Sequence, residues 1–224
     1  MDKIVSLKAA IDHVKQGDTL MIGGFGGFGF PGNLVWEVAR RNVGELTVIA
    51  EDFGCGWRPY EMNSSPLLIK KLVKKAIISY AGGQQMVSDQ VFAGELELEM
   101  VPQGTLAERI RAGGAGIGGF YTPTGVGTVV AEGKETRVID GKEYLFELPL
   151  KSDVSLVKAW KADRMGNAVF KYTGINFNIC MAMAGKVVIL EAEEIVEPGE
   201  LSPEAIQLPG VFVDYVVKAE EVVI

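Results

Sequence analysis

Hydrophobic residues along this chain follow two alternating patterns. One is a short continuous apolar run, typical of a buried strand, and the other is the spacing of about 3.6 residues that is typical of an amphipathic helix. Residues 19–23 form such a run, and residues 33–41 behind it carry their apolar side chains on one helical face. The same reading predicts strands at 46–50, 76–80 and 96–101, and helices at 6–16, 66–75, 84–93 and 105–111. This alternation predicts a mostly parallel sheet covered by helices on both faces.

The second half of the chain departs from the simple alternation. Asp140-Gly141 stands between two strand-like segments, a combination that favours a hairpin with a type I′ turn. Further strands are predicted at 154–160, 187–195 and 211–217, and a helix at 176–184. No internal repeat, low-complexity linker or break in composition separates two domains. The predicted fold class is therefore α/β, an open, mostly parallel sheet with a β-hairpin-containing second half, in a single domain over residues 1–224.

Composition excludes several classes of function. The chain has 224 residues, of which 48% are hydrophobic and 23% charged, the ordinary balance of a globular protein. Its net charge of −7 leaves no basic footprint for nucleic acid, so we expect no nucleic-acid partner. The single histidine, His13, argues against a Ser-His-Asp or Cys-His hydrolase and against a histidine-rich metal site. We therefore expect no metal.

Two further observations concern the compartment. The only cysteines, Cys55 and Cys180, are too few for a disulfide scaffold and fit a reducing environment as free thiols. No apolar run approaches the ~20 residues of a membrane helix, and the start of the chain, Met1-Asp2-Lys3-Ile4, lacks the apolar core of a targeting segment. We expect a cytoplasmic protein without a membrane partner.

Glycine is the one residue type in excess, with 28 copies that cluster. The first cluster fits the pattern G-x-G-x-x-G between a predicted strand and a predicted helix, as Gly24-Phe25-Gly26-Gly27-Phe28-Gly29. Glu51 and Asp52 follow about twenty residues later, as in dinucleotide sites whose helix amides hold a pyrophosphate. A tight turn with close helix–sheet packing is the other explanation. Nothing downstream supplies a site for hydride transfer. A nicotinamide-dependent dehydrogenase is therefore only the alternative function.

Two more segments are candidates for chemistry. Gln103 lies where a predicted strand ends and a helix begins, the edge at which open α/β sheets bind ligands. Its amide is either a neutral donor to an oxyanion or a cap on the helix. The glycine-rich segment 113–127 carries apolar anchors such as Ile117 and Phe120, and a stretch of this length is more typical of a functional loop than of a flexible one.

Taken together, the glycine-centred segments resemble the signatures of the family I CoA transferases. The first signature is similar to residues 20–31, Leu-Met-Ile-Gly-Gly-Phe followed by Gly29 and Pro31. The family's central blocks are similar to residues 101–116 and 120–128, which contain Val-Pro-Gln-Gly-Thr and Phe-Tyr-Thr-Pro-Thr-Gly. Asp140-Gly141-Lys142 and the segment 174–178, Gly-Ile-Asn-Phe-Asn, also fit. The resemblance covers nearly the whole chain and points to the alpha subunits of 3-oxoacid and acetate/acetoacetate CoA transferases.

The resemblance implies a covalent ping-pong reaction without metal or redox cofactor, in which coenzyme A is a substrate. A glutamate attacks a short acyl-CoA, expected to carry a 3-oxo group, and a glutamyl–CoA thioester then passes CoA to a small carboxylic acid such as acetate. In the family this glutamate lies in a Ser-Glu-Asn-Gly motif of the beta half, and Glu-Asn-Gly is absent here. The chain is therefore expected to be an alpha subunit that needs a separate beta subunit, most simply as two alpha and two beta chains.

The same resemblance assigns site residues by position. Gln103 is implied to be the oxyanion donor. The residues implied to approach CoA or the reacting acyl group are Gly23, Gly24, Phe25, Gly26, Gly27, Phe28 and Gly29.

This sequence departs from the family at two loops near the expected acyl site. Glu51-Asp52-Phe53 stands where relatives often carry an asparagine-rich turn, and residues 81–85, Ala-Gly-Gly-Gln-Gln, stand where a Gly-x-Asn turn is common. These departures bear on the acid substrate and leave the reaction class unchanged. The acidic pair predicts selection of a substrate that bears an amine.

Overall fold

A central sheet of eight strands organises the computed structural model, which describes residues 2–54 and 64–220. Seven strands lie in the order β11-β10-β8-β1-β2-β3-β4 and pair in parallel, and β9 pairs antiparallel with β8. The strand bounds are β1 (Thr19–Ile22), β2 (Leu46–Ile49), β3 (Val73–Ile78), β4 (Glu97–Met100), β8 (Ser152–Asp163), β9 (Ala168–Val169), β10 (Gly185–Val196) and β11 (Tyr215–Lys218). The predicted open, mostly parallel sheet is confirmed.

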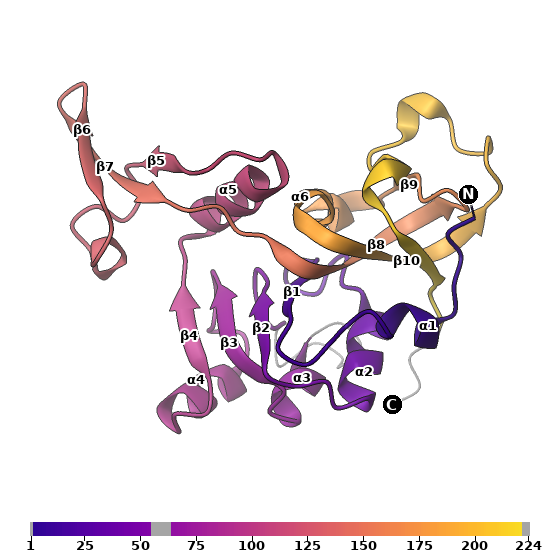
Figure 1. Cartoon of the computed structure of the whole chain (residues 1–224), viewed down its shortest axis with the longest axis horizontal. Coiled ribbons are helices and arrows are strands. Elements are labelled where there is room, and N and C mark those ends of the chain that lie inside the picture. Colours follow the sequence, from indigo (N-terminus) through magenta and orange to yellow (C-terminus); the bar gives the residue numbers. More distant parts are fainter. Residues whose placement is uncertain (1, 55–63, 221–224) are drawn as a thin grey trace.

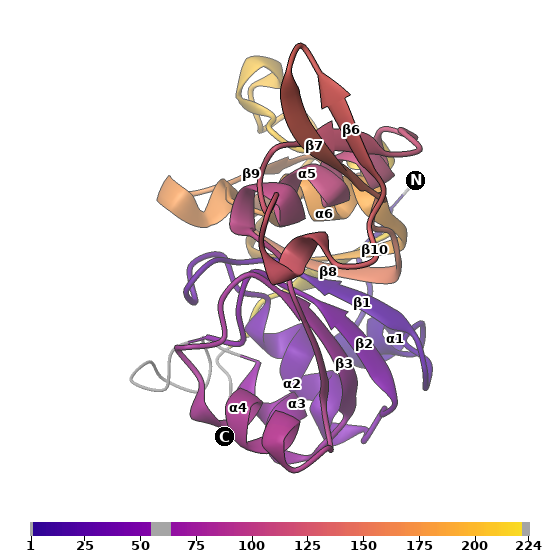
Figure 2. The same cartoon turned by 90° about the vertical axis from the view of Figure 1, so that its left-hand side faces the viewer.

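Helices cover both faces of this sheet (Figures 1 and 2). One layer contains α1 (Leu7–Ile11), α2 (Gly32–Arg40), α3 (Ser65–Ile69) and α4 (Gln85–Phe92), and the other contains α5 (Gln103–Gly114) and α6 (Asn178–Ala184). Successive side chains of a strand point to opposite faces. In β1, Leu20 and Ile22 accordingly join the core under the first layer, whereas Met21 joins the core under α5 and α6. Burial on both faces explains why the strands form continuous apolar runs in the sequence.

A second, three-stranded antiparallel sheet projects from the main body, at the far left of Figure 1. It consists of β5 (Phe120–Thr122), β7 (Lys142–Glu147) and β6 (Thr136–Ile139), in that order. Asp140 and Gly141 connect β6 to β7 with φ of 49° and 76°. Two successive positive φ values are those of a type I′ turn, so the predicted hairpin is confirmed.

The predicted helix at 66–75 is wrong in its second half. The helix α3 ends at Ile69, Lys71 takes a left-handed φ of 53°, and β3 begins at Val73. Pairing with both β2 and β4 fixes this segment as a strand, and Lys75 forms ion pairs of 2.8 and 3.2 Å with Glu97 and Glu99. Sheet pairing outweighs the local helical spacing here.

Other predicted helix and strand boundaries also differ from those in the structure. The first helix covers only Leu7–Ile11 of the predicted 6–16, and the last strand starts at Tyr215 after a 3₁₀ turn at Gly210–Phe212. Further 3₁₀ turns lie at Val129–Ala131, Tyr172–Ile175 and Pro203–Ala205.

Gly113 and Gly114 lie inside α5, beyond the predicted end of this helix at residue 111. A Cβ at Gly113 would lie 1.8 Å from the Leu150 carbonyl oxygen, and one at Gly114 would lie 2.8 Å from Cβ of Met183. These two glycines therefore allow α5 to pack closely against α6 and the segment before β8. In the part of the chain that the structure describes, no helix has the length and apolarity needed to cross a membrane.

Candidate functional site

The carboxyl ends of β1, β2, β3 and β4 meet at one edge of the sheet, and the segments that follow them line an open cavity of about 540 Å³. The residues that line it are Phe25, Gly26, Glu51, Asp52, Ser79, Tyr80 and Gln103. Each of the four strands is followed by at least one of them. This edge is where open α/β sheets bind their ligands.

The glycine segment after β1 forms a miniature hairpin at this edge. Phe25 and Phe28 exchange two backbone hydrogen bonds of 3.0 and 3.1 Å. Between them, Gly26 and Gly27 have φ of 57° and 89°, values that suit a type I′ turn and favour glycine. Phe25 and Phe28 are 44% and 48% exposed. This glycine hairpin, residues 23–29, therefore presents bare backbone flanked by two aromatic rings.

Asp52 holds the hairpin from the β2 side. Its Oδ2 accepts a hydrogen bond of 3.0 Å from the backbone N–H of Gly26, and its Oδ1 accepts one of 2.6 Å from Gly54. One carboxylate thus ties the tip of the hairpin to the loop that follows β2.

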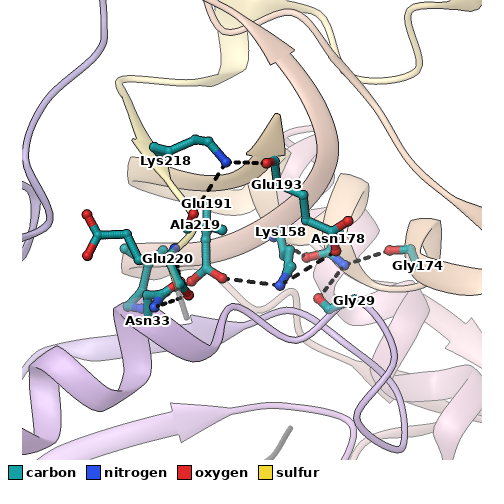
Figure 3. Close-up of polar contacts among 11 residues, drawn as sticks. Gly29, Asn33, Lys158, Gly174, Asn178, Glu191, Glu193, Lys218, Ala219 and Glu220 are labelled. Carbon is teal, nitrogen blue, oxygen red and sulfur yellow. Dashed lines mark hydrogen bonds and ion pairs between the residues drawn. The ribbon is translucent and has the colours of Figure 1, made fainter. Parts of the chain in front are cut away.

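Asn178 holds the hairpin from the opposite side, at the start of α6 (Figure 3). Its Nδ2 donates to the carbonyl oxygens of Gly29, at 3.0 Å, and Gly174, at 2.8 Å, and its Oδ1 accepts from the backbone N–H of Lys158 at 2.9 Å. A Cβ at Gly23 would lie 1.9 Å from Oδ1 of Asn178, and one at Gly29 would lie 2.6 Å from the Gly174 oxygen. The first and last glycines of the hairpin are thus required by close approach.

Glu191 of β10 occupies the N-terminus of α2. It is 1% exposed, its Oε2 accepts a hydrogen bond of 3.2 Å from the Leu34 N–H, and its Oε1 lies 3.3 Å from Nζ of Lys158 (Figure 3). Burial raises the pKa of Glu191, and the Lys158 ammonium opposes that shift. A dinucleotide site would need these helix amides for its pyrophosphate. The protein's own carboxyl group already takes them, which disfavours the dehydrogenase alternative.

A second cavity, of about 450 Å³, lies on the other side of the glycine hairpin. Its lining includes Gly27, Phe28 and Gly29 of the hairpin, together with Lys158, Trp160, Lys171, Tyr172 and Glu191. Nζ of Lys171 lies 5.4 Å from the Trp160 ring and 5.3 Å from the Tyr172 ring. The glycine hairpin therefore separates a cavity whose only charged described lining residues are acidic from a cavity whose lining also includes lysines.

Glu51 contributes a buried carboxyl group with a raised pKa to the first cavity. It is only 4% exposed, and its Oε1 accepts a hydrogen bond of 2.9 Å from Oγ of Ser79. Its Oε2 has no hydrogen-bond partner among the residues that the structure describes. Burial, and then the neighbouring Asp52 carboxylate, raise the pKa of Glu51 to about 8. At neutral pH this side chain is therefore mainly a protonated carboxylic acid.

Gln103 is the first residue of α5 and is exposed to the first cavity. No side-chain hydrogen bond caps the start of α5, so the capping explanation of Gln103 finds no support. The amide is available to a ligand.

The expected CoA-approaching residues divide into three groups. Phe25 and Gly26 share the first cavity with Gln103, whereas Gly27, Phe28 and Gly29 line the second. Gly23 and Gly24, the first residues of the hairpin, line neither of these two cavities, and Gly23 packs on Asn178. Cys55 lies outside the described residues, within which no cluster of His, Cys, Asp and Glu could hold a metal ion.

Sequence reasoning misses two residues that shape the site, Asn178 and Glu191. The segment 174–178 stands out only as a fitting motif, with no indication that its last asparagine reaches back to the glycine hairpin. Glu191 sits within an apolar strand pattern and gives no signal of its own.

Comparison with known proteins gives a consistent result. The model of the coenzyme A transferase family matches residues 4–219. A protein of Bacillus subtilis, named as one subunit of a probable succinyl-CoA:3-ketoacid coenzyme A transferase, is 51% identical over 218 residues, which are 97% of this chain and 90% of that protein. The alpha subunit of the acetate CoA-transferase of Escherichia coli is 41% identical, with 98% of each chain covered.

Among solved structures, the thioester complex of an acyl-CoA transferase from Escherichia coli O157:H7 superposes with a TM-score of 0.87 at 24% identity. That match covers 97% of this chain and 47% of the other, so this chain spans about half of that longer protein. None of these matches supports a dehydrogenase.

Replacement of Asn178 by alanine is expected to destabilise the protein. The Asn178→Ala substitution leaves two carbonyl oxygens and one N–H without their partner, which should lower the free energy of unfolding by about 2–4 kcal/mol. Urea denaturation measures this change. Gln85→Ala, which removes an exposed amide from the start of α4, is the matched control and should stay within about 0.5 kcal/mol of wild type. Equal stability of the two variants would contradict the proposed anchoring.

Proposed function

This chain belongs to the coenzyme A transferase family, and we propose that it is the alpha subunit of an enzyme that moves CoA between a short acyl-CoA and a small carboxylic acid. The relatives from Bacillus subtilis and Escherichia coli, each named as one subunit of its transferase, support this role because each is matched over nine-tenths or more of its length. Their names, which include 3-ketoacid and acetate, support a 3-oxoacyl donor and an acceptor such as acetate.

The exchange is balanced without any change of oxidation state. A thioester and a free carboxylate enter. The acyl–sulfur bond of the donor breaks and its acyl carbon gains an oxygen, while one carbon–oxygen bond of the acceptor carboxylate breaks and its acyl carbon bonds to the CoA sulfur, so that one oxygen passes from acceptor to donor. CoA is then a substrate and no resident cofactor is proposed. The proposed nucleophile is a glutamate of a partner beta subunit, which carries CoA as a glutamyl thioester between the two half-reactions.

Gln103 is the proposed oxyanion donor of this chain. Attack on a thioester carbonyl places negative charge on its oxygen, and an amide N–H stabilises that charge without itself needing to ionise. The twelve-residue helix α5 begins at Gln103, so the positive end of its dipole also faces the cavity. The observation that carries the proposal is the meeting of this free amide and the glycine hairpin on one cavity at the strand ends.

The glycine hairpin is proposed to bring backbone close to CoA or the reacting acyl group. Gly26 and Gly27 at its tip have no side chains, and the rings of Phe25 and Phe28 face one cavity each. Gly23 and Gly29 contribute by allowing the hairpin to pack closely against Asn178, and Gly24 contributes a left-handed φ of 112° beside the backbone of Phe28 and Phe30.

Replacement of Gln103 tests the assignment of the oxyanion donor. In the assembled complex, Gln103→Ala should lower turnover by roughly 10²–10³, because one donor to the developing charge is lost. Steady-state thioester exchange measures this loss. Gln16→Ala is the matched control, since it removes an exposed glutamine amide from the loop that enters β1, at the opposite end of the strands from the cavity, and it should retain the wild-type rate. Near-wild-type turnover of Gln103→Ala would remove its catalytic role and favour a non-catalytic scaffold role for this chain.

Assembly with a second chain is a separate prediction. Size-exclusion chromatography with light scattering should show one complex of the mass of two alpha and two beta chains when this chain is mixed with its partner. The partner to test is the protein encoded by the neighbouring open reading frame that carries a Ser-Glu-Asn-Gly sequence. Independent elution of the two chains at micromolar concentration would contradict the proposed assembly.

A further inference from the structure

The chemistry of the first cavity is unusual for a site that must accept a carboxylic acid. Its described lining contains two carboxyl groups, those of Glu51 and Asp52, and none of its described lining residues is Lys, Arg or His. The remaining polar lining groups are the hydroxyls of Ser79 and Tyr80 and the amide of Gln103. A ligand in this cavity therefore meets an acidic end, from the loop after β2, and a neutral donor end, from the start of α5.

Glu51 lines this cavity, and only one of its two carboxyl oxygens accepts a hydrogen bond from the described residues. Its Oε1 is satisfied by Ser79, whose Oγ lies 2.9 Å away, and the Ser79 and Tyr80 N–H groups donate to the Glu51 main-chain oxygen at 3.0 and 3.2 Å. These bonds fix the position of the side chain. Its buried Oε2 has no hydrogen-bond partner by geometry among the described residues, and the interaction of Glu51 with the neighbouring Asp52 side chain raises the Glu51 pKa, so a positively charged donor on a ligand would complete the pair.

Asp52 supplies fixed acidity beside this free oxygen. Both of its oxygens already accept backbone hydrogen bonds, from Gly26 and Gly54, so its position is set by the glycine hairpin and its own loop. Carboxylate oxygens have further lone pairs after one such bond each. The two acidic side chains thus offer acceptors to the same space, one of them unused.

We propose, on the basis of the transferase function above, that Glu51 and Asp52 form a subsite for the ammonium group of a short amino-substituted carboxylic acid or its thioester. An ammonium group carries three donors and one positive charge, which match the free acceptors and the acidity of the pair. A second carboxylate on the substrate would instead meet like charge, with no cation in the described lining to compensate it. The carboxyl or thioester carbon of the same ligand would lie toward Gln103.

The proposal includes a proton balance. With a pKa of about 8 in the free protein, Glu51 is protonated at neutral pH, and an ammonium ligand draws it into the ionised form, releasing that proton to solvent. Binding of the amino acid should therefore strengthen as pH rises toward 8. The other titratable groups that line the cavity are Asp52 and the Tyr80 hydroxyl, and the segments after β1 and before α5 add only uncharged residues, Phe25, Gly26 and Gln103.

Competition between isosteric acids tests the subsite. In the assembled complex with one acyl-CoA donor, kcat/KM is measured between pH 6 and 9 for 3-aminobutyrate, for 3-methylbutyrate, in which a methyl group replaces the ammonium, and for succinate. We expect the amino acid to exceed its methyl isostere by roughly 10-fold or more at pH 8, as a charge-assisted contact to a buried acceptor provides. This preference should grow between pH 6 and 8.

Substitutions separate the subsite from the rest of the site. Glu51→Gln keeps the shape but cannot ionise, so the preference for the amino acid should fall roughly 10-fold and lose its pH dependence. Glu97→Gln on β4 removes an exposed, ion-paired carboxylate outside the cavity and should leave the preference unchanged. If Glu51→Gln fails to fold, Ser79→Ala is the second variant. It removes a hydrogen bond that lowers the Glu51 pKa, so the rise of the preference should move to higher pH.

The results distinguish failure of the ammonium subsite from failure of the proposed transferase function. Exchange with 3-methylbutyrate at a rate equal to or above that with 3-aminobutyrate, or a preference for succinate, would overturn the ammonium subsite and leave the transferase function intact. An amino preference that Glu51→Gln and Ser79→Ala do not alter would also overturn it. Absence of CoA exchange with every acid, acetate included, would overturn the proposed function itself.

Discussion

The hydrogen bonds that hold the glycine hairpin from both sides are the constraint on which the site depends. Asp52 binds its tip at Gly26, and Asn178 binds its last carbonyl at Gly29. A typical hydrogen bond contributes about 0.5–1.5 kcal/mol, and the close approach at Gly23 leaves no room for any side chain at that position. The hairpin is therefore held in one place, and the two cavities lie on its two sides.

The starts of α2 and α5 differ in the groups that they meet: a buried, charged pair at α2 and an exposed, neutral amide at α5. Buried Glu191 binds the start of α2 and Lys158, so it stabilises the scaffold beneath the hairpin. The start of α5, by contrast, has no side-chain cap and carries the exposed Gln103 amide. Of these two helix N-termini, one thus receives a buried carboxyl group of the protein and the other has no side-chain cap. An open, neutral donor at the strand ends suits a thioester whose carbonyl oxygen becomes negative during attack.

Sequence patterns predict those features whose causes are local. The strand–helix alternation predicts the parallel sheet, and Asp140-Gly141 predicts its hairpin, because a type I′ turn needs two successive residues with positive φ. The predicted boundary between α3 and β3 is wrong because pairing with two neighbouring strands decides it. Anchoring by Asn178 could not be predicted, since its hydrogen bond to Gly29 joins residues 149 positions apart. The cavity brings the predicted Gln103, Phe25 and Gly26 together with Glu51 and Asp52, a meeting that only the fold reveals.

The central claim is that this chain furnishes half of a catalytic cleft, with neutral hydrogen-bond donors at its strand ends, while a second chain brings the nucleophile. Its most direct test is the rate of thioester exchange for this chain alone, for its partner alone, and for mixtures of varied proportion at constant total concentration. The account predicts no exchange by either chain alone and a maximum at equal proportions. Full exchange by the purified chain without a partner would contradict it.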